Sequence, residues 1–248
     1  MTNSSPKTAV DTLYSSNQSD LSPFAFNQAV VDVFPDMINR SVPGYQIIVD
    51  GIGKISSRTL SSGATVYDLG CSLGAVSLSI AKHCQGKALN VFAVDNSEAM
   101  VERCSQHIGA FKFDSHISVQ QADVTQLSFE PCDMIVINFT LQFIDRDKRQ
   151  ALVDRLYEAL KPGGKLIMSE KVREQNKMLD AMLVDLHHDF KKSNGYSELE
   201  ISQKRSALEN VMVLDDIETH SQRLRTAGFL ASTVWYRHFN FLSMCAVK

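Results

Sequence analysis

Residues 66–74 read Val-Tyr-Asp-Leu-Gly-Cys-Ser-Leu-Gly, an apolar run that leads into a turn marked by two glycines. The run predicts a buried strand, and the glycines let a ligand approach the backbone of the following loop closely. Asp95 closes the next apolar run. The ends of neighbouring parallel strands lie side by side, where an acidic residue can accept hydrogen bonds from both hydroxyls of a ribose. These residues predict a nucleoside pocket; the alternative is a structural turn, with Asp95 capping the next helix.

The composition is that of an ordinary globular chain. Its 248 residues are 44% hydrophobic and 21% charged, with a net charge of −3, which gives no electrostatic case for direct nucleic-acid binding. The five cysteines never form a CxxC pair, so we expect neither a disulfide framework nor a thiolate metal site. No apolar run approaches the roughly 20 residues that cross a membrane. We expect a cytoplasmic protein, with polar residues 1–22 as a flexible tail and residues 23–248 as a single domain.

Strand and helix patterns alternate after residue 60. We predict strands at 64–69, 89–94, 117–121, 134–138 and 165–169, and helices at 73–83, 97–107 (with Ser97 as N-cap) and 148–160. Repeated units of this length indicate a parallel sheet covered on both faces. A helix at 216–227 and strands at 233–237 and 241–247 follow. The link between these last strands is too short for a parallel crossover, so this pair should be antiparallel.

Two further segments flank this pattern. Residues 24–60 suggest a helical cap of short helices broken at Pro35 and Pro43, with a longer helix near 47–60. Residues 171–214 form a charged, amphipathic insertion, too long for a simple connection and suited to substrate specificity. The predicted fold is therefore α/β: a Rossmann-like, doubly wound, mostly parallel sheet with an antiparallel last strand, N-terminal helices and a helical insertion after the fifth strand.

The loop at 70–74 also separates cofactor classes. Nicotinamide folds use GxGxxG to bring a pyrophosphate onto a helix N-terminus, whereas Ser72 stands here in place of the middle glycine. The segment resembles instead the first motif of class I S-adenosylmethionine-dependent methyltransferases. The resemblance extends to Asp95, to Asp123 and Val124, to Asn138 with the Phe-Thr that follows, and to Leu-Lys-Pro-Gly-Gly at 160–164. It implies that Asp123 hydrogen-bonds the adenine amino group and that Val124 packs beside the ring.

The insertion carries a more specific resemblance. Segments 34–38, 41–45 and 187–205, together with 68–74, resemble the carboxy-S-adenosyl-L-methionine synthase family. Members of that family convert S-adenosylmethionine and prephenate into carboxy-S-adenosylmethionine and phenylpyruvate, and a separate transferase uses the product on the wobble uridine of transfer RNA. The resemblance implies a homodimer without a metal. The ligand contacts it implies are Tyr45, Gly70, Cys71, Ser72, Asp95, Asn96, Asp123, Val124, Asn138 and Arg205.

Arg205 is the residue that best explains why a carboxylated cofactor, and not the plain methyl donor, is favoured in the family that the chain resembles. Two positive charges about 5 Å apart repel by roughly 3 kcal/mol at an effective dielectric of about 20, so a guanidinium beside a sulfonium methyl is unfavourable. A carboxylate on that carbon makes the arrangement favourable, because arginine offers it a bidentate fork. We therefore expect Arg205 and Tyr45 to act at the reacting carbon. From the bare sequence, the alternative for Arg205 is a solvent-exposed helix position.

Other readings of the chain stay open. His187 and His188 are adjacent and lack the i,i+4 spacing of helical zinc ligands, which favours packing or substrate hydrogen bonding. Lys191, Lys192 and Lys204 are candidates for the two carboxylates of prephenate. The rival functions are a conventional methyltransferase for a small molecule or RNA, and a non-catalytic module that binds the cofactor.

Overall fold

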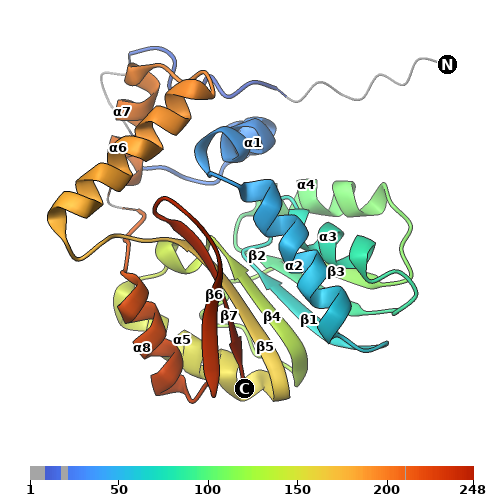
Figure 1. Cartoon of the computed structure of the whole chain (residues 1–248). Helices are drawn as coiled ribbons and strands as arrows, with labels where there is room; N and C mark the ends of the chain where they lie inside the picture. The colour runs from blue at the N-terminus through green and yellow to red at the C-terminus, as the bar shows by residue number, and fades with distance from the viewer. Residues whose placement is uncertain (1–8, 18–21, 210) are drawn as a thin grey trace.

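Seven strands form one sheet in the order β3-β2-β1-β4-β5-β7-β6 (Figure 1). The computed structural model describes residues 9–17, 22–209 and 211–248. The strands are β1 (Thr65–Leu69), β2 (Asn90–Asp95), β3 (His116–Gln121), β4 (Cys132–Asn138), β5 (Leu160–Lys171), β6 (Ala231–His238) and β7 (Phe241–Val247). Strands β1 to β5 pair in parallel, and β7 runs antiparallel to both β5 and β6. The predicted mostly parallel sheet with an antiparallel end is confirmed.

Helices cover both faces of the sheet, which is why β1 and β4 are apolar along nearly their whole length. On one face, α2 (Tyr45–Thr59) and α3 (Ala75–His83) pack their apolar residues against β1 and β4. On the other face lie α5 (Arg146–Ala159) and α8 (Ile217–Ala227). Helix α4 (Glu98–Gly109) connects β2 to β3, and the Ser97 side chain caps its start as predicted, accepting a hydrogen bond from the Met100 N–H.

The N-terminal cap consists of two helices, α1 (Gln28–Ser41) and α2. The break predicted at Pro43 is confirmed, since Pro43 lies in the short connection between them. The break predicted at Pro35 is wrong, because α1 continues through it. A proline inside a helix costs about 3 kcal/mol. Val31 and Met37 lie on either side of it and are fully buried, and such side chains each contribute roughly 1.5–3 kcal/mol on burial. Packing therefore outweighs the lost backbone hydrogen bond.

The insertion after β5 folds into α6 (Lys177–Ser193) and α7 (Glu198–Leu208), which confirms its helical character. Polar residues start both helices: Asn176 caps α6, and Ser197 forms a capping box with Glu200 at the start of α7. The two helices lie beside α1, beyond the edge of the sheet where β1, β2 and β4 end (Figure 1). The insertion therefore faces the end of the sheet at which the sequence placed the ligand.

The described part of the N-terminal segment docks on the insertion. Asp11 is only 2% exposed; its N–H donates to Asp36, and its carboxylate accepts a hydrogen bond from the Tyr196 hydroxyl. The side-chain amide of Gln203 donates to the carbonyl of Tyr14. These contacts correct the expectation of a flexible tail for this part of residues 1–22. Residues 1–8 and 18–21 of that tail lie outside the described residues.

Candidate active site

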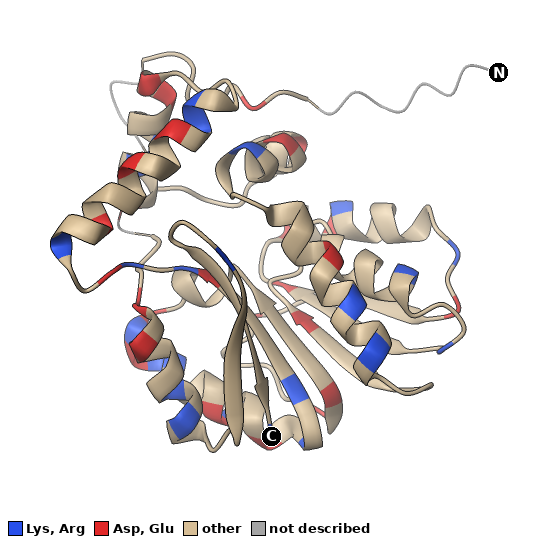
Figure 2. Ribbon diagram, viewed as in Figure 1, with Lys and Arg blue, Asp and Glu red and all other residues tan. Residues whose placement is uncertain are grey.

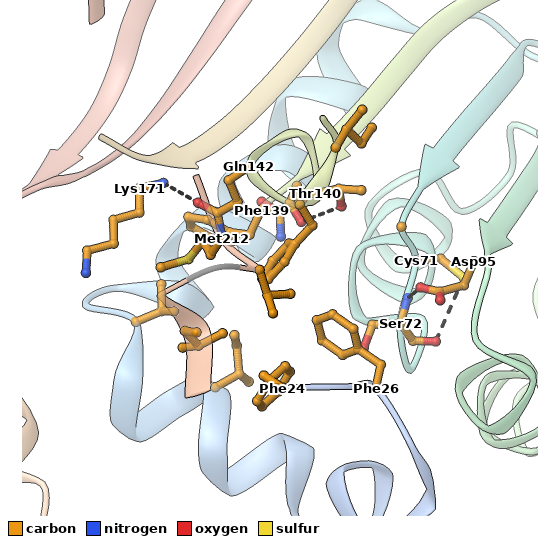
Figure 3. Close-up of a pocket in the computed structure, with 18 of the residues that line it drawn as sticks. Phe24, Phe26, Cys71, Ser72, Asp95, Phe139, Thr140, Gln142, Lys171 and Met212 are labelled. Atoms are coloured by element: carbon orange, nitrogen blue, oxygen red, sulfur yellow. Dashed lines mark hydrogen bonds between the residues drawn. The ribbon is translucent and has the colours of Figure 1, made fainter. Parts of the chain in front are cut away.

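A cavity of about 460 Å³ opens at the carboxyl ends of β1, β2 and β4 (Figure 3). Helices α1 and α2 and the insertion supply its remaining walls. The ends of parallel strands leave backbone and polar side chains free to meet a ligand, and the order reverses here between β2-β1 and β4-β5. The cavity is therefore where a doubly wound sheet binds its ligand.

The glycine loop after β1 is shaped by close approach to the β4 loop. Gly70 has φ +76°, and a Cβ built there would lie 2.1 Å from Oγ1 of Thr140, so only glycine fits. Ser72 also has a positive φ, 51°, and its N–H donates to Oδ2 of Asp95 at 2.9 Å. Oδ1 of Asp95 accepts from the N–H of Ser97 at 3.0 Å. Asp95 thus supports the start of α4, as the alternative reading held, and also lines the cavity.

Several oxygen acceptors gather at this end of the cavity. Oδ1 of Asp68 and Oδ1 of Asn138 are buried with no hydrogen-bond partner among the described residues. Burial raises the pKa of Asp68 to about 6, against hydrogen bonds from Ser77, and burial also raises the pKa of Asp95. Asp123 accepts hydrogen bonds from the N–H and the hydroxyl of Thr125. Unpaired buried acceptors call for donors from a ligand, and this end suits a cationic ligand that carries hydroxyl groups.

Two aromatic residues, Tyr45 and Phe139, also line the cavity. Burial, and then the charge of Asp68, raise the pKa of Tyr45, so its hydroxyl remains a donor. The ring of Phe139 lies 6.4 Å from that of Tyr45, and its backbone has φ +57°. A bulky residue rarely adopts this conformation, and residues held so concentrate at functional sites. Here the N–H of Phe139 is fixed by the carbonyl of Ser169.

The opposite end of the cavity is basic. Figure 3 shows Lys171 on the side away from Cys71, Ser72 and Asp95. Lys191 and Lys204 of the insertion line the same cavity, together with His187. The Nε2–H of His187 donates to the carbonyl of Ser41, and its ring packs on Phe241. Burial, and then the charges of Lys171 and Lys191, hold the pKa of His187 far below its usual value, so the imidazole is neutral.

The structure brings together nine of the ten predicted ligand contacts. These residues line the cavity: Tyr45, Gly70, Cys71, Ser72, Asp95, Asn96, Asp123, Val124 and Asn138. Arg205 does not. It is exposed on α7 and lines a separate hollow with Glu174, Asp180 and Asp185. Within a single copy of the chain Arg205 therefore does not reach the cavity, and its predicted contact with the ligand stays a prediction.

Some lining residues were missed by the sequence reasoning. Lys171 ends β5, next to β4 in the sheet, so its place at a strand end was an available signal. Phe139 follows β4 directly, but a positive φ at phenylalanine has no sequence signature. Of the predicted lysines, Lys192 lies outside the cavity, exposed and paired with Glu198 at 2.8 Å.

Within residues 9–17, 22–209 and 211–248, no group of three or more His, Cys, Asp or Glu could hold a metal ion. The helices in that same part of the chain include none that is long and apolar enough to span a membrane.

Relatives by sequence match the chain along nearly its whole length. A family model described as a methyltransferase domain matches residues 66–164. A carboxy-S-adenosyl-L-methionine synthase from Pseudoalteromonas translucida is 49% identical over 97% of this chain and 100% of its own length. One of the same name from Vibrio cholerae is 50% identical over 96% of this chain and 97% of its own length.

Solved structures share the fold at low sequence identity. An O-methyltransferase family protein from Burkholderia thailandensis matches with a TM-score of 0.64 at 15% identity, covering 93% of this chain and 65% of that one. Human N-acetylserotonin methyltransferase, solved in complex with S-adenosylmethionine, matches with a TM-score of 0.58 at 18% identity. The match covers 89% of this chain and 55% of that one. These likenesses confirm the Rossmann-like methyltransferase fold.

Proposed function

This chain belongs to the carboxy-S-adenosyl-L-methionine synthase family, a family of S-adenosylmethionine-dependent enzymes, and from that premise we propose that it makes carboxy-S-adenosylmethionine from S-adenosylmethionine and prephenate. The observation that carries the proposal is the two-ended cavity. Carboxylates and unpaired oxygen acceptors line one end, which suits a sulfonium-bearing nucleoside. Lysines line the other end, which suits a co-substrate with two carboxylates.

The proposed reaction balances without a redox partner. Prephenate loses its ring carboxylate as carbon dioxide and its hydroxyl as hydroxide, and the ring becomes aromatic in phenylpyruvate. A proton leaves the sulfonium methyl and neutralises the hydroxide, giving water. The methyl carbon forms a bond to the carbon dioxide. The protein encloses the reactants so that the carbon dioxide is captured before it diffuses away.

The acidic end supplies the proposed contacts to S-adenosylmethionine. Asp95, Asp123 and Val124 line this end. We assign Asp95 to the ribose hydroxyls, Asp123 and Val124 to the adenine, and the backbone of the 70–74 loop to the amino-acid portion, as the resemblance implies. Tyr45 faces the same space with its hydroxyl protonated, which suits hydrogen bonding to the new carboxylate.

Arg205 fits this reaction only if a second copy of the chain delivers it. Its side chain lies outside its own cavity. The neighbouring helix α6 exposes four large apolar side chains: Met178 (80% exposed), Leu179, Met182 and Leu186. Their spacing of three and four residues places them along one side of the helix. Such a contiguous apolar stripe is uncommon on a monomer and suits a symmetric dimer. We propose a homodimer in which the partner's insertion completes each site.

We propose that the product is released and then used by a separate enzyme that modifies the wobble uridine of transfer RNA. Acidic and basic residues are interspersed along α6, α7 and α8 (Figure 2), which does not favour direct binding of RNA by these helices. We propose that the activity is cytoplasmic and that the chemistry needs no metal, as the resemblance to the family implies.

Mass spectrometry with S-adenosylmethionine carrying a trideuterated methyl group tests the reaction. We expect prephenate to yield an adenosyl product heavier by one carboxyl group, with at most two deuterium atoms left on that carbon. Transfer of the intact trideuterated methyl to an acceptor would instead establish a conventional methyltransferase. Bound S-adenosylmethionine that stays unchanged in the presence of prephenate would establish a binding module.

Mixing two inactive variants tests the role of the second copy. In a mixed dimer of Arg205→Ala and Asp95→Ala, the pocket of the first subunit is intact and receives Arg205 from the second. Random pairing then restores about a quarter of wild-type activity, because half the dimers are mixed and each has one working site. Each variant alone is the control. A mixture as inactive as its components would show that Arg205 does not act across subunits.

A further inference from the structure

Two lysines in the cavity have no anionic partner. Lys191, on α6, is 9% exposed, and Lys171 ends β5 with its Nζ 5.6 Å from the centre of the Phe241 ring. Neither ammonium makes an ion pair or a hydrogen bond with any residue that the structure describes. Both belong to the wall formed by β5 and the insertion.

The other basic groups nearby are already neutralised or lie elsewhere. The ammonium of Lys204 lies 3.4 Å from Oδ2 of Asp11 and 3.1 Å from the Ser41 hydroxyl. Lys192 pairs with Glu198 in solvent. The neutral His187 adds no charge. Lys171 and Lys191 therefore leave the basic end with an uncompensated positive charge.

Burying a cation without a partner is unfavourable, and this cost lowers the pKa values of both lysines. Burial, followed by the charge of Lys171, lowers the pKa of Lys191 to about 7. Burial, followed by the charge of Arg205, lowers the pKa of Lys171 to about 8. Placing two such cations in one cavity destabilises the free protein, which an incoming anion reverses.

We propose that Lys171 and Lys191 bind the carboxylate of the co-substrate that survives the reaction, the 2-oxo acid end that prephenate shares with phenylpyruvate. This inference rests on the proposed function for the identity of the co-substrate. It leaves Lys204 as a structural partner of Asp11. It assigns the carboxylate of the 2-oxo acid to a pair of lysines of which the sequence suggested only Lys191.

The choice between the two carboxylates follows from the chemistry. As the ring carboxylate becomes carbon dioxide, its negative charge disperses, so a tightly paired cation would stabilise the starting state more than the transition state. The carboxylate of the 2-oxo acid keeps its charge throughout. Lysines that bind this carboxylate can position the substrate without raising the activation barrier to decarboxylation.

Calorimetric titration of enzyme loaded with S-adenosylhomocysteine tests the assignment without turnover, because that ligand has no methyl group to react. The variants are Lys171→Met and Lys191→Met, which keep the apolar stem and remove the charge. Lys191→Gln is a second variant in case the first fails to fold. Lys192→Met is the control on the same helix. The probes are prephenate and phenylpyruvate, and thermal melting reports on folding.

We expect each of the cavity variants to weaken both probes by at least about tenfold, as loss of a charge-assisted contact does. The affinity for S-adenosylhomocysteine should stay unchanged, and Lys192→Met should match the wild type. Weaker prephenate binding with unchanged phenylpyruvate binding would overturn the assignment, since the lysines would then hold the ring carboxylate. Unchanged binding of both probes would also overturn it.

The two proposals fail in different ways. An enzyme that makes the carboxylated product, with lysine variants that bind both probes normally, refutes the anion site and keeps the reaction. An enzyme that binds phenylpyruvate through Lys191 but makes no carboxylated product from prephenate refutes the reaction and keeps the anion site.

Discussion

Lys204 and Asp11 form a buried ion pair that joins the insertion to the N-terminal segment, with Nζ and Oδ2 separated by 3.4 Å. The same carboxylate oxygen accepts the hydrogen bond of the Tyr196 hydroxyl, and Tyr196 also stacks beneath the guanidinium of Arg40. Asp11 thus joins the N-terminal segment to α7 through its carboxylate and to α1 through its N–H, which donates to Asp36. Its loss should loosen the wall of the cavity.

We expect Asp11→Ala to destabilise the protein by about 3 kcal/mol, because it leaves a buried ammonium and a buried hydroxyl without their acceptor. Urea unfolding measures the change. In a Lys204→Met background the same substitution should cost clearly less, since no cation remains to be stranded. Equal costs in the two backgrounds would mean that the ion pair does not support the fold.

Gly70 should tolerate no side chain. Both Gly70 and Gly63 have positive φ values, +76° and +74°, but a Cβ on Gly63 meets nothing within 4 Å. Gly63→Ala should cost about 1 kcal/mol from the backbone conformation alone. Gly70→Ala should cost at least about 2 kcal/mol more, because its Cβ collides with Thr140. The difference between the two unfolding free energies isolates the collision, and similar values would show that the loop adjusts freely.

Asp95 should carry much of the affinity for the nucleoside. Asp95→Asn removes the charge and keeps one acceptor oxygen, which can serve the N–H of Ser72 or that of Ser97 but not both, because the two groups donate to different oxygens of Asp95. A hydrogen bond to a charged group contributes about 1.5–3 kcal/mol, so S-adenosylhomocysteine should bind roughly 10- to 100-fold more weakly. Asp147→Asn, an exposed carboxylate on α5, is the control. Calorimetry measures the dissociation constants. If the two variants bind S-adenosylhomocysteine equally well, Asp95 serves only to support the start of α4.

The sheet and its ligand-binding edge could be predicted because the central strands β1, β2 and β4 are largely apolar. Asp68, Asp95 and Asn138 come together at one edge for a topological reason, since parallel strands end on the same side. Most boundaries shifted by a residue or two, but β5 begins five residues before its predicted start, and the helix through Pro35 depends on apolar burial that local sequence rules do not include.

The insertion was less predictable because its geometry is set by tertiary contacts. Nothing in the local sequence distinguishes Lys191, which faces the cavity, from Lys192, which faces solvent. The outward position of Arg205 depends in the same way on how α7 packs. The polar composition of residues 1–22 predicts a flexible tail, and it gives no sign of the buried carboxylate of Asp11.

The affinity of the basic end for phenylpyruvate should fall as pH rises. The ammonium groups attract the carboxylate only when protonated, and the pKa values of Lys191 and Lys171 are about 7 and about 8. The charges that act on this pair are those of Lys204 and Arg205 on α7 and Asp180 on α6, while His187 is neutral throughout this range. Affinity should therefore be greatest below about pH 7 and decline through pH 8 to 9.

Calorimetric titrations of phenylpyruvate between pH 6.5 and 9, with S-adenosylhomocysteine bound, measure this decline and the proton uptake that accompanies it. The bound anion favours the charged lysines and so raises their pKa values, which means that the decline begins near the pKa values of the free protein and ends only above those of the complex. Lys191→Met should retain a single, later decline that belongs to Lys171. Lys192→Met should reproduce the wild-type curve. An affinity that stays level from pH 6.5 to 9 would show that neither lysine titrates against the ligand, and the carboxylate would then lie elsewhere in the cavity.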